Sequence, residues 1–259
     1  MALEKNITKS LLRYPGGKTR AVPMLLKYFP QELTELVSPF FGGGSIEFAL
    51  ADRGVRIYGY DNFYPLTIFW KCALTQPAAL AAQIEKYYPL SKPAFYEMQA
   101  TLDTYKYKNL DYAARFFVLN RASFSGSTCS GGMSPNHPRF TPSAIARVKA
   151  FAAPLVTVKK SDFSYSLAKH PDLWAYLDPP YLIANNLYGY KGDGQRDFDH
   201  QKLRKILEKR KNWILSYNDS EEIRKLYKGF DIISLDWKYG LAKDKSKTAK
   251  EILIIRGTT

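Results

Sequence analysis

One stretch near the N-terminus restricts the possible folds of the 259-residue chain more than any other. Residues 34–40 form a short apolar run that leads into a glycine cluster, and residues 45–54 have the spacing of a helix that ends at a glycine. Residues 55–61 form a second strand-like run that ends at an acid. This order is typical of the β-loop-α-β unit of a doubly wound sheet, so we predict an α/β protein whose ligand lies outside the carboxyl ends of its strands.

Helical patterns interrupt this alternation between residues 64 and 150. Several helix-like stretches are followed there by residues 122–143, which are rich in Ser, Gly and Pro and cannot form a long element. Strand-like runs resume at residues 154–160 and recur to residues 251–256. We therefore predict that residues 1–63 and 151–259 form the α/β domain, with residues 64–150 as a mostly helical insertion.

The charge balance indicates an acidic partner. The chain has 38 Lys and Arg against 24 Asp and Glu, a net charge of +14, which favours nucleic acid, although an ordinary basic enzyme is equally compatible. Cys72 and Cys129 lie far apart and in no metal-like spacing with the histidines, so we expect a reducing compartment and no metal site. Apolar runs are too short for a membrane span. We expect a cytoplasmic protein, monomeric in solution.

Residues 14–19 read Tyr-Pro-Gly-Gly-Lys-Thr, which resembles the end of a phosphate-binding P-loop. A complete P-loop also needs a glycine at position 12, directly after a buried strand. Leu12 occupies that position, and the residues before it are too polar and too few for such a strand. The sequence therefore argues against a nucleotide hydrolase of the P-loop class.

The most specific short stretch is Asp178-Pro179-Pro180-Tyr181, directly after the apolar residues 173–177. A strand that ends in a Pro-Pro turn is one interpretation. The other is a site for an aromatic amine, whose lone pair is freed when both N–H groups find acceptors. Asp178 and the carbonyl of Pro179 supply two acceptors on a backbone stiffened by proline, and Tyr181 offers a face for stacking. The carboxylate also matches the positive charge that develops on the amine during transfer.

Three blocks, residues 14–18, 39–45 and 178–181, resemble in content and order the Dam-type family of S-adenosylmethionine-dependent DNA adenine-N6 methyltransferases. The likeness runs weakly from about residue 11 to residue 256. It implies a Rossmann-like methyltransferase sheet and methylation of N6 of adenine in double-stranded DNA, with the base flipped out of the helix. It also implies that the helical insertion is the target-recognition region.

The resemblance implies a cofactor site built from several segments. The glycines of residues 42–44 would let the backbone approach the methionine portion, and Asp61 would accept the ribose hydroxyls unless it merely caps a helix. Tyr14 stands where the family more often has Trp, and Lys18 would meet a carboxylate. The predicted cofactor-binding residues are Tyr14, Lys18, Phe40, Gly42, Gly44, Asp61, Asp162, Phe163 and Asp178, and the predicted catalytic residues are Asp178, Pro179, Pro180 and Tyr181.

Residues 120–126 resemble the family's Arg-x-x-Phe-Asn-Gly element. Arg121 would contact DNA, unless it is an ordinary cation at a helix end, and Phe124 would wedge or stack. Ser125 stands where Asn is usual, and residues 138–144 differ from the family's recognition hairpin, so GATC is not predicted as the target sequence. The predicted DNA-binding residues are Asn120, Arg121, Phe124, Ser125 and Gly126.

Three further segments receive predictions from this context. Residues 182–198 are a candidate lid, residues 216–218 resemble an element near the flipped base, and the Lys-rich residues 238–250 would contact phosphates. The alternatives are the same chemistry on RNA adenine, cytosine N4 or a protein glutamine, or an inactive DNA-binding relative. We expect a restriction-modification type of enzyme in a bacterial, archaeal or phage-infected cell.

Overall fold

The computed structural model describes residues 8–14, 17–104, 106, 109–134, 139–182, 198–237 and 249–257. They contain a seven-stranded sheet with the order β3-β2-β1-β4-β5-β7-β6. The strands are β1 (Glu35–Ser38), β2 (Arg56–Asp61), β3 (Val156–Lys160), β4 (Trp174–Leu177), β5 (Trp213–Asn218), β6 (Asp231–Trp237) and β7 (Ala249–Arg256). The chain moves outward from β1 to β3 and then, starting again at β4, in the other direction, which confirms the predicted doubly wound α/β class.

The first five strands set the position of the site. β1 pairs in parallel with β2 and β4, β2 pairs in parallel with β3, and β4 pairs in parallel with β5. β7 lies between β5 and β6 and runs antiparallel to both. Because the carboxyl ends of parallel strands share one edge of the sheet, the loops after β1, β2, β3 and β4 meet there. The strand order reverses between β1 and β4, where sheets of this class bind ligands.

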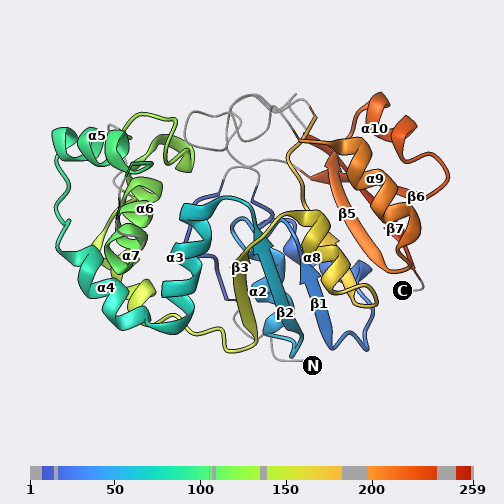
Figure 1. Ribbon diagram of the computed structural model, residues 1–259, viewed down its shortest axis with the longest axis horizontal. Coiled ribbons are helices and arrows are strands. Elements are labelled where there is room, and N and C mark those ends of the chain that lie inside the picture. Colours follow the sequence, from blue (N-terminus) through green and yellow to red (C-terminus); the bar gives the residue numbers. More distant parts are fainter. Residues whose placement is uncertain are drawn as a thin grey trace.

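Helices cover both faces of the sheet (Figure 1). Neighbouring residues of a strand point to opposite faces, so Leu36 packs into the core shared with α1, α2 and α3, and Val37 into the core shared with α8, α9 and α10. This burial on both faces explains the nearly continuous apolar runs of the parallel strands. These helices are α1 (Val22–Leu25), α2 (Ser45–Ala51), α3 (Tyr64–Thr75), α8 (Phe163–Lys169), α9 (His200–Lys209) and α10 (Glu221–Leu226), and a 3₁₀ turn, η1 (Leu26–Tyr28), follows α1.

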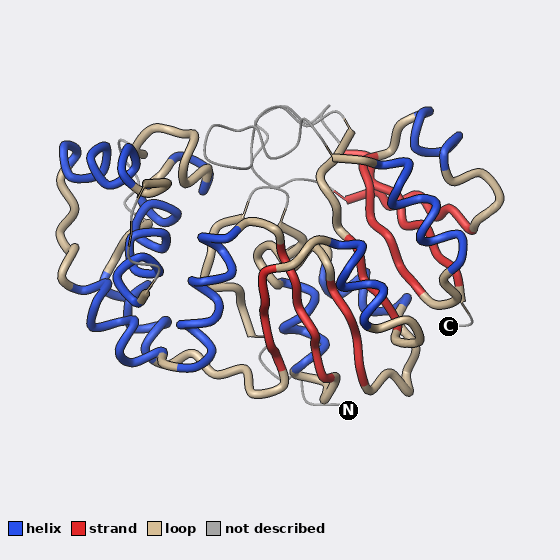
Figure 2. Tube along the Cα trace, viewed as in Figure 1, coloured by secondary structure: helices blue, strands red, loops and turns tan. Residues whose placement is uncertain are grey.

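Helices alone occupy one end of the molecule, as Figure 2 shows. They are α4 (Pro77–Glu85), α5 (Lys92–Thr101), α6 (Leu110–Ala122) and α7 (Pro142–Lys149), with a 3₁₀ turn, η2 (Phe124–Gly126), after α6. Side-chain oxygens of Ser91, Asn109 and Thr141 cap α5, α6 and α7. α3 packs against β2, β3 and α6, so the helical end shares a continuous apolar core with one face of the sheet. Within the described ranges, no helix is both long and apolar enough to cross a membrane.

Candidate active site

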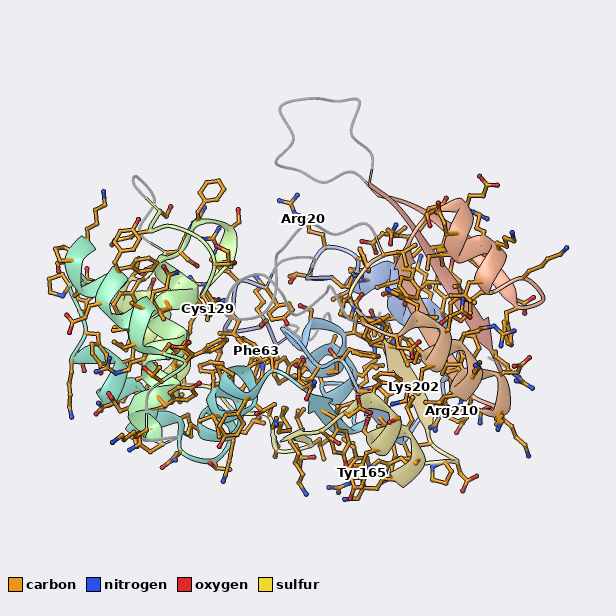
Figure 3. The ribbon with its side chains drawn as sticks, turned by 45° about the horizontal axis from the view of Figure 1, so that its top comes forward. Arg20, Phe63, Cys129, Tyr165, Lys202 and Arg210 are labelled. Atoms are coloured by element: carbon orange, nitrogen blue, oxygen red, sulfur yellow. The ribbon has the colours of Figure 1, made fainter. Side chains whose placement is uncertain are left out.

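A cavity of about 660 Å³ lies at the carboxyl ends of β1 to β4. Its lining includes every residue that the sequence predicted to bind cofactor or to be catalytic, from Tyr14 and Lys18 near the N-terminus to Tyr181 after β4. Phe63 and Lys202, which also line it, reach it from the start of α3 and from α9, and Figure 3 labels both. The topology thus gathers segments that lie far apart in the sequence into one site.

The glycine loop after β1 is pressed against Tyr14. Gly42 has a φ of +48°, and a Cβ atom there would lie 2.9 Å from the Tyr14 ring. The Trp70 indole, from α3, donates a hydrogen bond of 2.9 Å to the Gly42 carbonyl, and this bond fixes the loop to the helix. Only glycine satisfies both the conformation and the close approach. Tyr14 therefore helps to shape this wall of the cavity.

Asp61 connects the loops after β1 and β2. Its carboxylate accepts hydrogen bonds from the backbone N–H groups of Gly42, at 3.0 Å, and Phe63, at 2.9 Å. Burial raises the pKa of Asp61 to about 6, although these N–H groups act in the opposite direction. The N-cap position of α3 is Phe63, so Asp61 is not the cap of that helix. Each carboxylate oxygen keeps a lone pair for a ligand.

Three aromatic rings form another wall. Phe40 and Phe163, which were predicted to bind cofactor, contact Phe198, which was predicted only as the last residue of the candidate lid, and the ring centroids are 5.3 to 5.6 Å apart. Asp162 caps α8 by accepting a hydrogen bond of 2.8 Å from the Ser164 backbone N–H. Burial by itself would raise the pKa of Asp162, but the hydrogen bonds from Ser164 bring it below its usual value. The contact predicted between Asp162 and adenine stays a prediction.

The Asp178 carboxylate lies in a buried network. Lys18 Nζ donates to both Asp178 oxygens, at 2.8 and 2.9 Å, and to the Tyr181 hydroxyl at 2.6 Å. Ser216 Oγ, from β5, donates to Asp178 Oδ1 at 2.9 Å, so the predicted residues 216–218 do reach the site. Lys18 Nζ also lies 3.6 Å from Oε2 of Glu251, on β7. Lys18 thus contacts two carboxylates of the protein itself, and its predicted contact with the cofactor stays a prediction.

Lys18 stays protonated despite its burial. Burial alone would lower the pKa of its ammonium, but the carboxylates of Asp178 and Glu251 raise it above its usual value. One cation therefore lies between two acids at the end of β4. In the described part of the chain, no group of three or more His, Cys, Asp or Glu side chains forms a candidate metal site.

Sequence reasoning missed one further acid in the cavity wall. Glu47, in the first turn of α2, is only 2% exposed and accepts a hydrogen bond of 2.6 Å from Ser38 Oγ. Burial raises the pKa of Glu47 to about 7, although the Ser38 hydrogen bond opposes this shift. The available signal was an acid flanked by Ile46 and Phe48 on a helix that must cover an apolar sheet. Such a position is buried, and its acid faces either a partner or a ligand.

The last turn of α6 and the loop after it hold the predicted DNA-binding residues in different environments. Asn120 is 1% exposed, and its side chain accepts from the Arg13 backbone N–H at 2.8 Å and donates to the Arg13 carbonyl at 2.9 Å. Asn120 thus fixes the N-terminal segment to the loop. Ser125 has a φ of +53°, Gly126 is buried against Arg13, and the Phe124 ring is 65% exposed.

Four guanidinium groups surround this loop and the N-terminal segment; we call Arg13, Arg121, Arg139 and Arg147 the arginine cluster. Arg121 Nε donates to the Arg139 carbonyl at 2.9 Å, and Arg147 Nη2 donates to the Ser10 carbonyl at 2.9 Å. Burial, together with the other three positive charges, lowers the pKa of Arg121 to about 10. Across the described ranges, none of the four forms an ion pair with an acid. Uncompensated charge of this kind favours an anionic ligand.

Two predicted segments lie outside the described residues. Residues 183–197 contain nearly all of the candidate lid, and residues 238–248 contain most of the Lys-rich segment. Both remain predictions.

The strand order, the glycine loop after β1 and the Asp-Pro-Pro-Tyr stretch after β4 together define a Rossmann-like methyltransferase. The model of the D12 class N6 adenine-specific DNA methyltransferase family matches residues 14–241, and the chain belongs to this family. This confirms the predicted family and its reaction, methylation of DNA at N6 of adenine.

Two relatives carry names of the same kind. The chain is 21% identical to the Type II methyltransferase M.CviBI of Paramecium bursaria Chlorella virus NC1A, over 94% of this chain and 96% of that protein. It is 27% identical to the modification methylase StsI of Streptococcus sanguinis, over 75% of this chain but 31% of that longer protein. Methyltransferases of this kind use S-adenosylmethionine as methyl donor.

Proposed function

We propose that the cavity binds S-adenosylmethionine and that Asp178-Pro179-Pro180-Tyr181 receives the target adenine, flipped out of double-stranded DNA. The observation that carries this proposal is the single cavity that contains the glycine loop, Asp61, the aromatic wall and Asp178. Its volume of about 660 Å³ lies within the range of about 300–1,000 Å³ typical of small-molecule sites. The names of both relatives support a role in restriction-modification.

The residues present fit this cofactor. Gly42 makes room for the Tyr14 ring, and the loop backbone and this ring together line the cavity that the cofactor would occupy. Asp61 has lone pairs for ribose hydroxyls, and Phe40 and Phe163 offer ring faces for adenine. When bound, S-adenosylmethionine supplies an electrophilic methyl group.

The protein's part in the transfer falls mainly on Asp178. Its carboxylate accepts one N–H of the adenine amine, and the Pro179 carbonyl accepts the other, which frees the nitrogen lone pair. As the nitrogen becomes cationic, the carboxylate stabilises the positive charge and then takes up the proton. Tyr181 stacks on the base. Ser216, bonded to Asp178 at 2.9 Å, keeps the carboxylate oriented.

The DNA surface lies on the insertion and the N-terminal segment. A base within a duplex cannot reach a cavity of this kind, so it must be flipped out. The arginine cluster supplies cations for the phosphates, and the exposed Phe124 ring supplies a side chain that stacks on or wedges between bases. Asn120, Ser125 and Gly126 then contribute by holding this loop, and the monomeric state stays a prediction.

Transfer of labelled methyl groups tests the proposal. We expect label to enter unmethylated plasmid DNA as N6-methyladenine, with none in RNA. Asp178→Asn should reduce this transfer by at least about a hundredfold while leaving DNA binding within about twofold of wild type. Asp172→Asn, which changes an exposed acid just before β4, is the matched control. Label in RNA alone, or a parallel loss of DNA binding in Asp178→Asn, would contradict the proposal.

A further inference from the structure

A trio of charges lies beside the cavity: the partly exposed Asp178 and the buried Lys18 and Glu251. Lys18 is 4% exposed and Glu251 is 2% exposed, so solvent screens their charges little. The three residues come from distant parts of the chain. Asp178 lies in the loop after β4, Lys18 in the segment before α1, and Glu251 in β7. Only Glu251 among them is absent from the cavity lining.

The sheet topology explains how Glu251 reaches this position. β7 runs antiparallel between β5 and β6, and Glu251 pairs in register with Asn218, the last residue of β5. β5 is also the strand that delivers Ser216 to Asp178. Glu251 therefore lies next to Lys18 at the carboxyl end of β5. Lys18 Nζ is 3.6 Å from Glu251 Oε2 and 2.8 Å from Asp178 Oδ1.

The charges of the trio bear directly on the transfer. Asp178 has to stabilise positive charge on the amine, but both oxygens of its carboxylate already accept hydrogen bonds from the positively charged Lys18 ammonium. A pair of Asp178 and Lys18 alone would be neutral. Burial raises the pKa of Glu251, and the charge of Lys18 opposes this shift. With Glu251 ionised, the trio carries one net negative charge, and Lys18 has a second carboxylate to attract it when the amine approaches Asp178.

We infer that Glu251 is a positioning residue for methyl transfer: it holds Lys18 and offsets its charge, so that Asp178 faces the incoming amine from a site that is negative overall. The inference rests on the proposed function of the cavity. It assigns to the antiparallel strand β7 a part in the reaction, through an acid that touches neither adenine nor cofactor.

The closing experiment compares binding of S-adenosylmethionine, which carries a sulfonium charge, with binding of S-adenosylhomocysteine, which lacks it. Calorimetry on wild type, Glu251→Gln and Glu251→Asp gives both dissociation constants for each protein. Glu251→Gln should weaken S-adenosylmethionine binding by about tenfold and S-adenosylhomocysteine binding by less than about twofold, because only the former loses an attraction between charges. Glu251→Asp, which retains the charge, should restore most of the difference.

The rate of transfer provides a second readout. In a single turnover, Glu251→Gln should methylate DNA about tenfold more slowly than wild type at saturating cofactor, with DNA affinity unchanged, because Glu251 is buried. Glu35→Gln is the matched control: it removes an acid at the start of β1 that also accepts a hydrogen bond, from Tyr58.

The outcomes separate this inference from the function on which it rests. If wild type binds neither compound, the proposed cofactor site is wrong and the inference falls with it. If wild type binds both but Glu251→Gln weakens them equally, or Glu251→Asp behaves like Glu251→Gln, then Glu251 acts only through packing. In that case the inference alone is overturned.

Discussion

At the scale of single residues, Glu47 links the cavity to pH. Its ordinary pKa of 4.5 rises to about 7 on folding because the side chain is buried. Between these two values the folded protein binds more protons than the unfolded chain does. The contribution of Glu47 to the free energy of unfolding must therefore decrease as pH rises from about 4.5 to about 7, and the stabilisation that this side chain provides in acid is lost above that range.

Glu47→Gln should remove this dependence, because glutamine is neutral at every pH and can still accept the Ser38 hydrogen bond. We expect the variant to exceed wild type in stability by up to about 3 kcal/mol near pH 8.5, and by less than about 1 kcal/mol near pH 5. Urea unfolding at the two pH values measures the difference. Glu85→Gln, at an exposed position on α4, should show no such change with pH. A gain for Glu47→Gln that is equal at both values would contradict the assigned cause.

The residues that could be predicted from the sequence share one property. Asp61 and Asp178 directly follow apolar runs, so the carboxyl ends of parallel strands place them in the site without further information. Glu47 instead interrupts an apolar stretch and Glu251 precedes one, and their partners Ser38 and Lys18 are recognisable only in three dimensions. Phe198 was missed as part of the cofactor site because its ring enters the aromatic wall through tertiary packing.

At the scale of elements, hydrophobic runs predicted where the strands lie in the sequence but not which strands pair in the sheet. The order of β1 to β5 is that of the doubly wound class, which the alternation of strand-like and helical runs predicted, whereas the insertion of β7 between β5 and β6 depends on a pairing that no local pattern encodes. The short helices α1, α8 and α10 were not predicted either, because their four, seven and six residues show little periodicity. The loop after α6 was expected to be irregular, and its link to Arg13 became visible only in the structure.

Gly126 is the point at which that loop meets the N-terminal segment. It has a φ of +77°, and a Cβ atom there would lie 2.0 Å from the Arg13 carbonyl oxygen. Gly54 has a φ of +97° but no atom within 4 Å of such a Cβ, so it shares the conformation without the contact. A comparison of alanine at the two positions therefore separates backbone strain from packing.

We expect Gly126→Ala to lower the free energy of unfolding by about 2 kcal/mol more than Gly54→Ala does, because the loop and the Arg13 segment must move apart. DNA affinity should also fall in Gly126→Ala alone, since Arg13 belongs to the arginine cluster. Urea unfolding and fluorescence anisotropy measure the two effects. Equal losses of stability in both variants would show that the contact with Arg13 does not matter.

At the scale of the whole molecule, positive charge and cavity are arranged for a flipped base. The net charge of +14 attracts DNA over the surface as a whole, while the arginine cluster concentrates it where the N-terminal segment meets the insertion. The N-terminal segment also supplies Tyr14 and Lys18 to the cavity. One short stretch of chain thus connects the DNA surface with the site of transfer.

This arrangement predicts how salt affects DNA binding. Each phosphate contact releases counterions, so the slope of log K against log salt concentration is negative, and its magnitude falls by about 0.9 for every contact that is removed. Arg121→Gln and Arg147→Gln should each reduce the magnitude of the slope by about 1, measured by anisotropy between about 50 and about 200 mM salt. Arg56→Gln is the matched control, because this exposed arginine begins β2 and lies at the opposite edge of the sheet from the cavity. Its slope should equal that of wild type, since Arg56 lies at the amino end of β2 and the cavity lies at the carboxyl ends of the strands. A reduced slope in Arg56→Gln, or an unchanged slope in both cluster variants, would mean that DNA binds on another face.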